Sequence, residues 1–371
     1  MTLITKQMVS DQQAVADLEL EIVEHAQLKA AVDAVSALQA RSLVERNGRR
    51  LKARGLLLMG EAGAGKSTVL EVIATRNPAV EDKHGRVTPV LWVEVPEETT
   101  KRALVVAIIE AMGYKVDRDY NANDLIKRIA EKVRLLGIQL IMLDEAHHIL
   151  KSKEPSAVAE FLKSLLNRIG AQLLFSGLPD LKALASWRQF DRRLAPDVRL
   201  RPYDWTDVPQ RLEFLIFLSR LDEKGLALPE LSNLGNENVA RRLYTATRGE
   251  IGLVSKYLSQ ALLLARTRGL RSVSLELLAE VDASWHGSVA KSQDIAFDVD
   301  LDLEADTDLD VLLADMRRVR IDPETNPFAC PSANLERLLA VRIEKRDEFV
   351  KPGNRNSARA KGTGPDPLKV F

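Results

Sequence analysis

The amino-acid sequence predicts an α/β fold: a doubly wound parallel sheet followed by a C-terminal helical lid. Three observations predict it. An apolar run ends in a glycine-rich loop near residue 60, apolar runs then alternate with helical periodicities to residue 205, and only helical periodicity follows to residue 285. We therefore expect four parts: an N-terminal helical segment at 1–54, a core at 55–205, a helical lid at 206–285, and an acidic linker with a largely disordered tail at 286–371.

The composition excludes several classes of protein. The chain of 371 residues carries 53 basic and 53 acidic side chains, so its overall charge favours neither a nucleic-acid nor a membrane partner. Cys330 is its only cysteine, which excludes a disulfide framework within one chain and a cysteine zinc site. No apolar stretch reaches the roughly 20 residues that span a membrane, and the first residues lack the apolar core of a signal peptide. We expect a cytoplasmic protein without a membrane partner.

The expected elements follow in order. The N-terminal segment carries apolar residues at helical spacing from Leu18 to Leu43. The core contains strands at 56–59, 90–95, 139–143, 172–175 and 198–200, helices at 66–75, 100–112, 123–136 and 156–169, and a polar loop at 81–86. The lid contains helices at 208–224, 237–247, 251–268 and 274–283.

The glycine-rich loop carries the first motif. It reads GEAGAGKS and satisfies G-x-x-x-x-G-K-[ST] in full, with an apolar run before it and a helical pattern after it. Its glycines allow the backbone to aim N–H groups at phosphate oxygens, and the following helix adds a partial positive charge. Lys66 would reach the β- and γ-phosphates of ATP, and Ser67 would ligate Mg²⁺. The predicted ATP-binding residues are Gly60, Glu61, Ala62, Gly63, Ala64, Gly65, Lys66, Ser67 and Thr68.

The third strand of the core carries the second motif. Its apolar run, Ile138 to Leu143, ends in Asp144 and Glu145, which is typical of a Walker B strand. Asp144 would hold the same Mg²⁺ as Ser67. Glu145 would polarise the attacking water.

Residues 144–147 also spell DEAH, the signature of a class of helicases. Those helicases need a second sheet domain, whereas the chain after residue 205 shows only helices, so we set this interpretation aside. For His147 and His148 the sequence offers no other metal ligands nearby. Positions at the surface or behind the site are therefore the default for both.

Two further candidates come from the last two strands. Ser176 follows the fourth strand and could orient the water, although a simple strand-ending turn explains it equally well. Arg193 is the first choice, ahead of Arg188 and Arg192, for an arginine that reaches the γ-phosphate of a neighbouring subunit. Surface charges or partners of nearby aspartates are an equal alternative for all three.

The last two parts of the chain complete the fold class. A small helical lid after a P-loop core makes up an AAA+ module, so the predicted fold is a P-loop AAA+ core with a helical lid. Beyond it, acidic residues alternate with apolar ones from Asp298 to Asp310 without the spacing of an EF-hand, which favours an acidic linker. A short helix at 334–349 precedes an end that is rich in proline, glycine and basic residues.

Together these segments resemble the TniB/TnsC family, AAA+ ATPases that regulate DNA transposition and are related more distantly to MuB and the IstB-type helper ATPases. The resemblance is carried by GEAGAGKST, IMLDEAHHIL, LLFSGLPDL and TRGEIGLVSKYL, and by their spacing. It covers about residues 30–285. The Walker segments alone are not specific to this family. The pairing of SGLP with GEIG is more specific to it.

The resemblance implies an ATPase that binds ATP and Mg²⁺ and assembles with copies of itself on double-stranded DNA as a ring or helical filament. A transposase and a TniQ/TnsD-type target-selection protein would be its partners, and hydrolysis would disassemble the polymer. Thr100, Lys101 and Arg102 would contact DNA phosphates without reading bases, with an N-capped helix and exposed charges as an equal alternative. At Gly252 the chain departs from a common AAA+ pattern, which often has an arginine there. Residues 326–371 would bind the transposase.

Two other functional classes stay open. A loader ATPase would form a stable complex with a hexameric helicase. An ExeA-like secretion or signalling ATPase would have no DNA role, and such proteins usually carry a membrane segment or a peptidoglycan module, neither of which this sequence shows.

Overall fold

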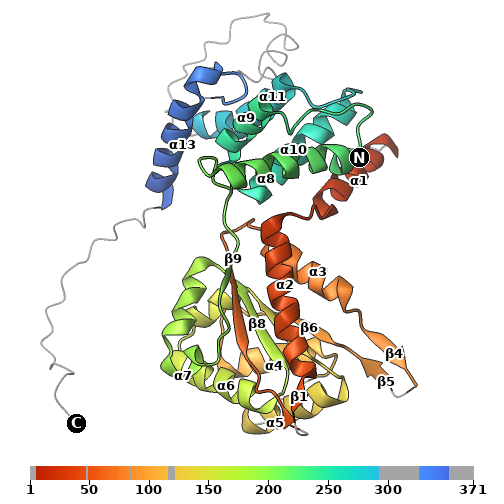
Figure 1. Cartoon of the computed structure of the whole chain (residues 1–371), viewed down its shortest axis with the longest axis vertical. Helices are drawn as coiled ribbons and strands as arrows, with labels where there is room; N and C mark the ends of the chain where they lie inside the picture. The colour runs from red at the N-terminus through yellow and green to blue at the C-terminus, as the bar shows by residue number, and fades with distance from the viewer. Residues whose placement is uncertain (1–5, 47–48, 84, 116–121, 292–325, 351–371) are drawn as a thin grey trace, which may run out of the picture.

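The computed structural model shows a sheet-containing core joined to a helical lid, with the N-terminal helices running alongside both (Figure 1). It describes residues 6–46, 49–83, 85–115, 122–291 and 326–350. The acidic stretch from Asp298 to Asp310 and the end of the chain at 351–371 lie outside the described residues. Within those ranges, no helix combines the length and the apolar character needed to cross a membrane.

The core is built on a five-stranded parallel sheet. Its strands, in the order in which they lie side by side, are β6 (Val90–Glu94), β7 (Leu140–Asp144), β8 (Gln172–Gly177), β3 (Gly55–Met59) and β9 (Val198–Arg199). They agree with the five predicted strands to within two residues at each end. The predicted doubly wound α/β class is therefore confirmed.

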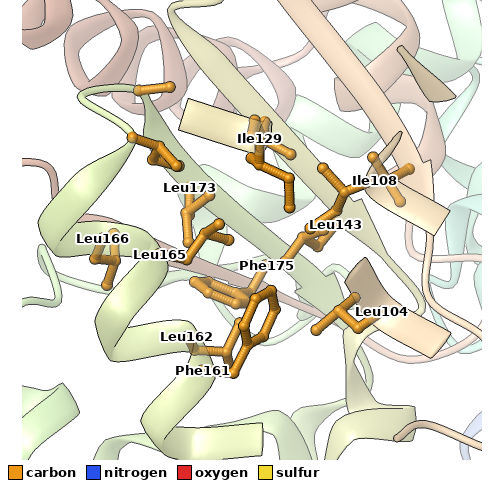
Figure 2. Packing of buried hydrophobic residues seen from close by; sticks show 14 of the residues in the cluster. Leu104, Ile108, Ile129, Leu143, Phe161, Leu162, Leu165, Leu166, Leu173 and Phe175 are labelled. Carbon is orange, nitrogen blue, oxygen red and sulfur yellow. The ribbon is translucent and has the colours of Figure 1, made fainter. Parts of the chain in front are cut away.

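Helices cover both faces of the sheet. One face carries α4 (Lys101–Ala111), α5 (Ala122–Leu135) and α6 (Pro155–Arg168), and the other carries α2 (Ala26–Ala40) and α3 (Lys66–Arg76). Successive strand residues point to opposite faces, so Phe175 of β8 packs with α6 while Leu174 packs with α2 and α3. In Figure 2 the α6 side chains Phe161, Leu162, Leu165 and Leu166 lie close to Leu173 and Phe175 of β8. Their three- and four-residue spacing is what places them on one side of α6.

Short elements frame the core: η1 (Arg41–Leu43), the antiparallel pair β1 (Glu45–Arg46) and β2 (Arg49–Arg50), the antiparallel pair β4 (Val80–Asp82) and β5 (Gly85–Val87), η2 (Ala146–Lys151), η3 (Pro179–Ser186) and α7 (Arg188–Asp191). The β4–β5 hairpin replaces the polar loop expected at 81–86, so that expectation is wrong. Each of its strands has only three residues, and the pair lacks the apolar alternation that marks a strand in a sequence.

The lid consists of α8 (Val208–Arg220), the π-helical turn η4 (Leu221–Gly225), α9 (Glu237–Thr247), α10 (Ile251–Thr267) and α11 (Leu275–Lys291). The four predicted lid helices are confirmed, and α11 continues past residue 285. The buried carboxylate of Asp222 accepts hydrogen bonds from the backbone N–H groups of Ser232 (2.9 Å) and Leu234 (3.1 Å). This fastens the loop between η4 and α9.

The two N-terminal helices attach to different parts of the molecule. α1 (Lys6–Leu20) packs along α10 of the lid, whereas α2 packs on the core. Asp11 of α1 is buried and lies 3.1 Å from the Arg266 side chain of α10. The linker at residues 21–25 therefore passes from the lid to the core.

Residues 326–350 fold onto the lid, which differs from the expectation of a largely disordered tail. They form η5 (Ser332–Asn334) and α13 (Leu335–Val350), which confirms the short helix expected at 334–349. Arg242 of α9 donates hydrogen bonds to three backbone carbonyls of this segment, at residues 327 (2.8 Å), 328 (3.1 Å) and 330 (2.8 Å).

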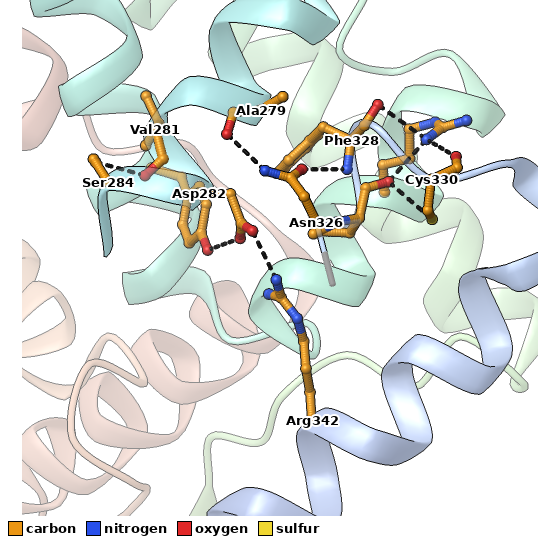
Figure 3. A network of polar contacts seen from close by, with 11 residues as sticks. Ala279, Val281, Asp282, Ser284, Asn326, Phe328, Cys330 and Arg342 are labelled. Carbon is orange, nitrogen blue, oxygen red and sulfur yellow. Dashed lines mark hydrogen bonds and ion pairs between the residues drawn. The ribbon is translucent and has the colours of Figure 1, made fainter. Parts of the chain in front are cut away.

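Buried polar side chains complete this attachment. Figure 3 shows Arg342 of α13 reaching Asp282 of α11, with 2.7 Å between guanidinium and carboxylate. The Tyr257 hydroxyl of α10 donates to the other oxygen of Asp282 at 2.5 Å. Asn326 donates its amide to the carbonyl of Ala279 at 2.7 Å. The segment after the acidic stretch is thus structurally part of the lid.

Candidate nucleotide-binding site

The loop between β3 and α3 has the backbone geometry of an anion cradle. Gly63 and Gly65 adopt positive φ angles of +78° and +88°, which few residues other than glycine adopt. Gly65 is the N-cap of α3 and no side chain caps the helix, so the N–H groups of its first turn are available to phosphate oxygens. The hydroxyl-bearing Ser67 is exposed at this helix start. These features fit a bound nucleoside triphosphate.

Lys66 lies in the centre of this cradle. Its side-chain amine donates hydrogen bonds to the carbonyls of Gly60 (2.9 Å) and Glu61 (2.8 Å). Burial lowers the pKa of Lys66, and the negative charges of Glu145, Asp144 and Glu61 act in the opposite direction. Carboxylates of both Walker segments, far apart in the sequence, therefore act electrostatically on one ammonium group.

Asp144 and Glu145 lie where β7 ends. The backbone N–H of Glu145 donates to the Asp144 carboxylate at 3.0 Å. Glu145 itself has a left-handed backbone, with φ +50° and ψ +32°, which costs a non-glycine residue on the order of 1 kcal/mol or more. Its side chain is 43% exposed, so water can reach the carboxylate. A carboxylate and a hydroxyl, from Asp144 and Ser67, are the hard oxygen donors that Mg²⁺ takes.

The two histidines after Glu145 contact the site more closely than the sequence suggests. Nδ1 of His147 lies 3.1 Å from a carboxylate oxygen of Glu145, yet this nitrogen is buried and forms no hydrogen bond of good geometry with any described residue. Burial, followed by the effect of His148, lowers the pKa of His147. His148 places its Nδ1 3.2 Å from the carbonyl oxygen of Val95, at the end of β6. Of the two expected positions, His147 takes the one behind the site, because it is 5% exposed and lies against Glu145.

Ser176 lies inside β8, which pairs with β7 as expected. It is opposite Leu58 of β3, is fully buried, and its hydroxyl makes no hydrogen bond among the described residues. The structure places Ser176 within a strand and not in the following turn. Its role in orienting water stays a prediction.

A cavity of about 180 Å³ next to the glycine-rich loop was not predicted from the sequence. It is lined by the linker between α1 and α2, by the loop itself, and by α8 and α10 of the lid. Val23, His25 and Phe217 give it apolar and aromatic walls, and the His25 ring lies 5.8 Å from that of Phe217 between centroids. Burial lowers the pKa of His25 to about 4, so the ring is neutral at physiological pH. Its walls come from three distant segments, which explains why no local sequence signal marks it.

The lid touches the glycine-rich loop through its backbone. The N–H of Gly252, at the start of α10, donates to the carbonyl of Gly63 at 3.0 Å. A Cβ atom at residue 252 would lie 2.5 Å from that carbonyl oxygen. The close approach gives a physical reason for glycine at the position where an arginine is often expected.

The remaining predicted residues lie away from this centre. The Arg193 carbonyl accepts a hydrogen bond from the N–H of Gly55 at 2.9 Å, at the opposite end of β3 from the glycine-rich loop. Arg193 is half-buried, Arg192 is exposed, and the side chain of Arg188 lies outside the described residues. Their role toward a neighbouring subunit stays a prediction.

Thr100 is the N-cap of α4, and its hydroxyl accepts a hydrogen bond from the N–H of Ala103 at 3.0 Å. Thr100 therefore caps the helix, which was the alternative to a DNA contact for this residue. Lys101 is half-buried and Arg102 is exposed on the first turn of the same helix. Contact of these three residues with DNA stays a prediction.

Comparisons with known proteins agree with this geometry. A family model described as "Bacterial TniB protein" matches residues 20–203, about half of the chain. No curated protein sequence matches the chain. Among solved structures, the ORC1 protein of Aeropyrum pernix in complex with DNA is similar with a TM-score of 0.54 and 17% identity, over 90% of this chain and 87% of that one.

Two further solved structures show the same likeness. The ORC2 protein of Aeropyrum pernix, in ADPNP–ADP complexes, has a TM-score of 0.50 and 15% identity over 89% of this chain and 97% of that one. A Drosophila ORC structure bound to DNA has a TM-score of 0.51 and 16% identity over 94% of this chain and 82% of that one. At these identities the likeness establishes the fold, a P-loop AAA+ core with a helical C-terminal part.

Proposed function

Residues 20–203 of this chain belong to the TniB family of AAA+ ATPases, and from that premise we propose that the protein is an ATP-dependent, sequence-nonspecific DNA-binding regulator of DNA transposition. The observation that carries the nucleotide part is the meeting of Lys66, Asp144 and Glu145 at one end of the sheet, with the lid closing the loop from the other side. The DNA and transposition parts rest on the family and on the resemblance of the motifs.

In the proposed reaction, different residues of the site bind the phosphates, hold the metal ion and orient the attacking water. The loop N–H groups and Lys66 bind the phosphates, with the phosphate oxygens replacing the two carbonyls that Lys66 now contacts. Ser67 and Asp144 would hold Mg²⁺, which when bound neutralises charge that develops on the phosphates. Glu145 accepts hydrogen bonds from the attacking water and orients it. The buried hydroxyl of Ser176, which forms no hydrogen bond among the residues that the structure describes, is the candidate for a second contact to that water.

The proposed DNA contact is electrostatic. Lys101 and Arg102 lie on the first turn of α4, the next helix after β6, and Val95 just past β6 contacts His148. They would pair with phosphates on double-stranded DNA, along which copies of the chain would assemble. Arg193, or Arg192 or Arg188, would then reach the γ-phosphate held by the next copy. A transposase and a TniQ/TnsD-type protein complete the proposal as partners, in the cytoplasm.

The first experiment tests the role of ATP in DNA binding. DNA binding should require ATP or a non-hydrolysable analogue, should not depend on sequence, and should weaken steeply with salt because it rests on phosphate contacts. Glu145→Gln should keep ATP and DNA binding but lose turnover. DNA binding that ignores ATP would overturn the proposal, and full turnover by Glu145→Gln would remove that residue from its role.

A second experiment locates the contacts. The double variant Lys101→Ala, Arg102→Ala should reduce the salt dependence of DNA binding, whereas the matched double variant Lys127→Ala, Arg134→Ala, on exposed positions of α5, should not. Arg193→Ala should depress hydrolysis in the assembled state and leave nucleotide binding by the single subunit intact. Unchanged hydrolysis in the assembled state would move the assignment to Arg188 or Arg192.

A further inference from the structure

The proposed reaction leaves two histidines beside its catalytic glutamate without a task. Glu145, His147 and His148 each offer a ligand atom, and these atoms all lie within 4.8 Å of one another. The two imidazole rings lie 4.4 Å apart between centroids. Two imidazoles and one carboxylate are a donor set that zinc and related transition metals take, in contrast to the oxygen-only set of Mg²⁺.

The hydrogen bonding of His148 prepares it to act as a ligand. Its Nδ1 lies 3.2 Å from the carbonyl oxygen of Val95, which can only accept a hydrogen bond. In a neutral ring Nδ1 therefore carries the proton, and Nε2 presents a lone pair. A backbone carbonyl that fixes the ring in this way is the usual support behind a metal-binding histidine.

His147 supplies a second observation. Its Nδ1 is buried, forms no hydrogen bond within the described part of the chain, and lies 3.1 Å from a carboxylate oxygen of Glu145. A buried nitrogen without a partner is costly in a folded protein, and a bound cation between the two groups would satisfy both. The left-handed backbone of Glu145 turns the chain so that the carboxylate and both rings come from residues this close in sequence.

We propose that Glu145, His147 and His148 bind a transition-metal cation of the zinc class, with water completing a tetrahedral shell, and that this ion blocks ATP hydrolysis by occupying the Glu145 carboxylate. The inhibition rests on the proposed catalytic role of Glu145, whereas the binding site itself does not. The site is distinct from that of Mg²⁺, which uses the oxygens of Ser67 and Asp144. Nucleotide binding therefore persists when the metal is bound, and turnover stops.

The binding test uses the full chain without nucleotide, because ATP itself chelates zinc. Calorimetric titration with Zn²⁺ should show one site, and Co²⁺ should give the visible absorption of a tetrahedral ion. His148→Gln, at a half-buried position, and His147→Ala should each weaken Zn²⁺ binding at least tenfold. The matched controls His84→Gln and Cys330→Ser should leave it unchanged. Equal Zn²⁺ affinity in the wild type and in both histidine variants overturns the site.

The activity test separates this site from the proposed function. Zn²⁺ added to the wild type in excess Mg²⁺ and ATP should stop hydrolysis while a fluorescent ATP analogue stays bound, and His148→Gln should resist the inhibition. Inhibition that is equal in His148→Gln overturns the proposed block. If Glu145→Gln retains turnover while the wild type still binds one Zn²⁺ through its histidines, the metal site stands and the catalytic assignment of Glu145 fails.

Discussion

The lid is attached to its two neighbours in different ways. Toward the C-terminal segment it uses buried side chains: Arg242 reaches three backbone carbonyls, and Arg342 pairs with Asp282. Toward the glycine-rich loop it uses a backbone hydrogen bond, from Gly252 to Gly63. The difference indicates that the lid and residues 326–343 form one unit, and that the contact with the nucleotide loop depends on backbone geometry.

The largest expected effect tests the side-chain attachment. Arg342→Met removes the guanidinium that pairs with the Asp282 carboxylate, which is 1% exposed and also accepts a hydrogen bond from the Tyr257 hydroxyl. Removing one partner of a buried ion pair costs about 3–5 kcal/mol, so the free energy of unfolding should fall by that order. Denaturant unfolding measures the loss, and hydrogen exchange should show it in α11 and α13.

The control for this prediction is a double variant. Adding Asp282→Asn to Arg342→Met removes the buried charge and should recover part of the lost stability. A single Arg342→Met variant as stable as the wild type would show that the C-terminal segment is not held as described.

The second effect tests the backbone attachment. Gly252→Ala places a methyl group 2.5 Å from the Gly63 carbonyl oxygen, so the lid must move away from the loop. Overpacking of this kind costs about 1–3 kcal/mol, which corresponds to a loss of roughly 5- to 150-fold in ATP affinity. Equilibrium binding of a fluorescent ATP analogue measures it. Lys256→Ala, exposed on the same helix, is the matched control, and equal affinity in both variants would contradict the described contact.

The third effect concerns His25, in the linker that passes between lid and core. Its pKa is lowered from 6.5 to about 4 by burial, so below pH 6.5 the unfolded chain binds a proton that the folded chain does not. Stability is therefore complete above pH 6.5 and declines toward pH 4, by about 2 kcal/mol between pH 6.5 and 5. His25→Gln should remove this part of the pH dependence in denaturant unfolding. Parallel curves for variant and wild type would show that His25 is not buried against Phe217.

The smallest expected loss of stability concerns an exposed ion pair between the lid and the C-terminal segment, which can be compared with the buried pair of Arg342 and Asp282. Arg241 of α9 and Glu336 of α13 lie 2.7 Å apart, but the side chains are 35% and 84% exposed. Exposed ion pairs contribute about 0–1 kcal/mol, so Arg241→Ala should change unfolding by no more than that. A loss as large as that of Arg342→Met would mean that surface charge, and not the buried network, holds α13 in place.

The sequence predicted the parts of this molecule whose signals are local. The strand, loop and helix around Lys66 are contiguous, and each buried strand is an apolar run bounded by polar residues, so the sheet and the Walker segments could be predicted. The β4–β5 hairpin was not predicted because its strands have only three residues each and show no apolar alternation. The helix α13 was expected, but its attachment to the lid was not, because it depends on partners about 60 and more residues away.

The candidate site shows the same limit. Asp144 and Glu145 could be predicted from the pattern of one strand. The contact of His147 with Glu145 depends on the left-handed backbone of Glu145, which no pattern of residues predicts. Likewise, Gly252 could be noticed only as a departure from a pattern. Its close approach to Gly63 becomes visible when the fold brings two distant turns together.

That approach has a consequence for protein engineering. The bond between residues 252 and 63 contains no side-chain atom. Any transplanted lid whose main chain follows the same path and has glycine at this point keeps the bond, whatever its other residues are. A chimera that carries a different lid should therefore keep this contact with the nucleotide loop while its outer surface changes.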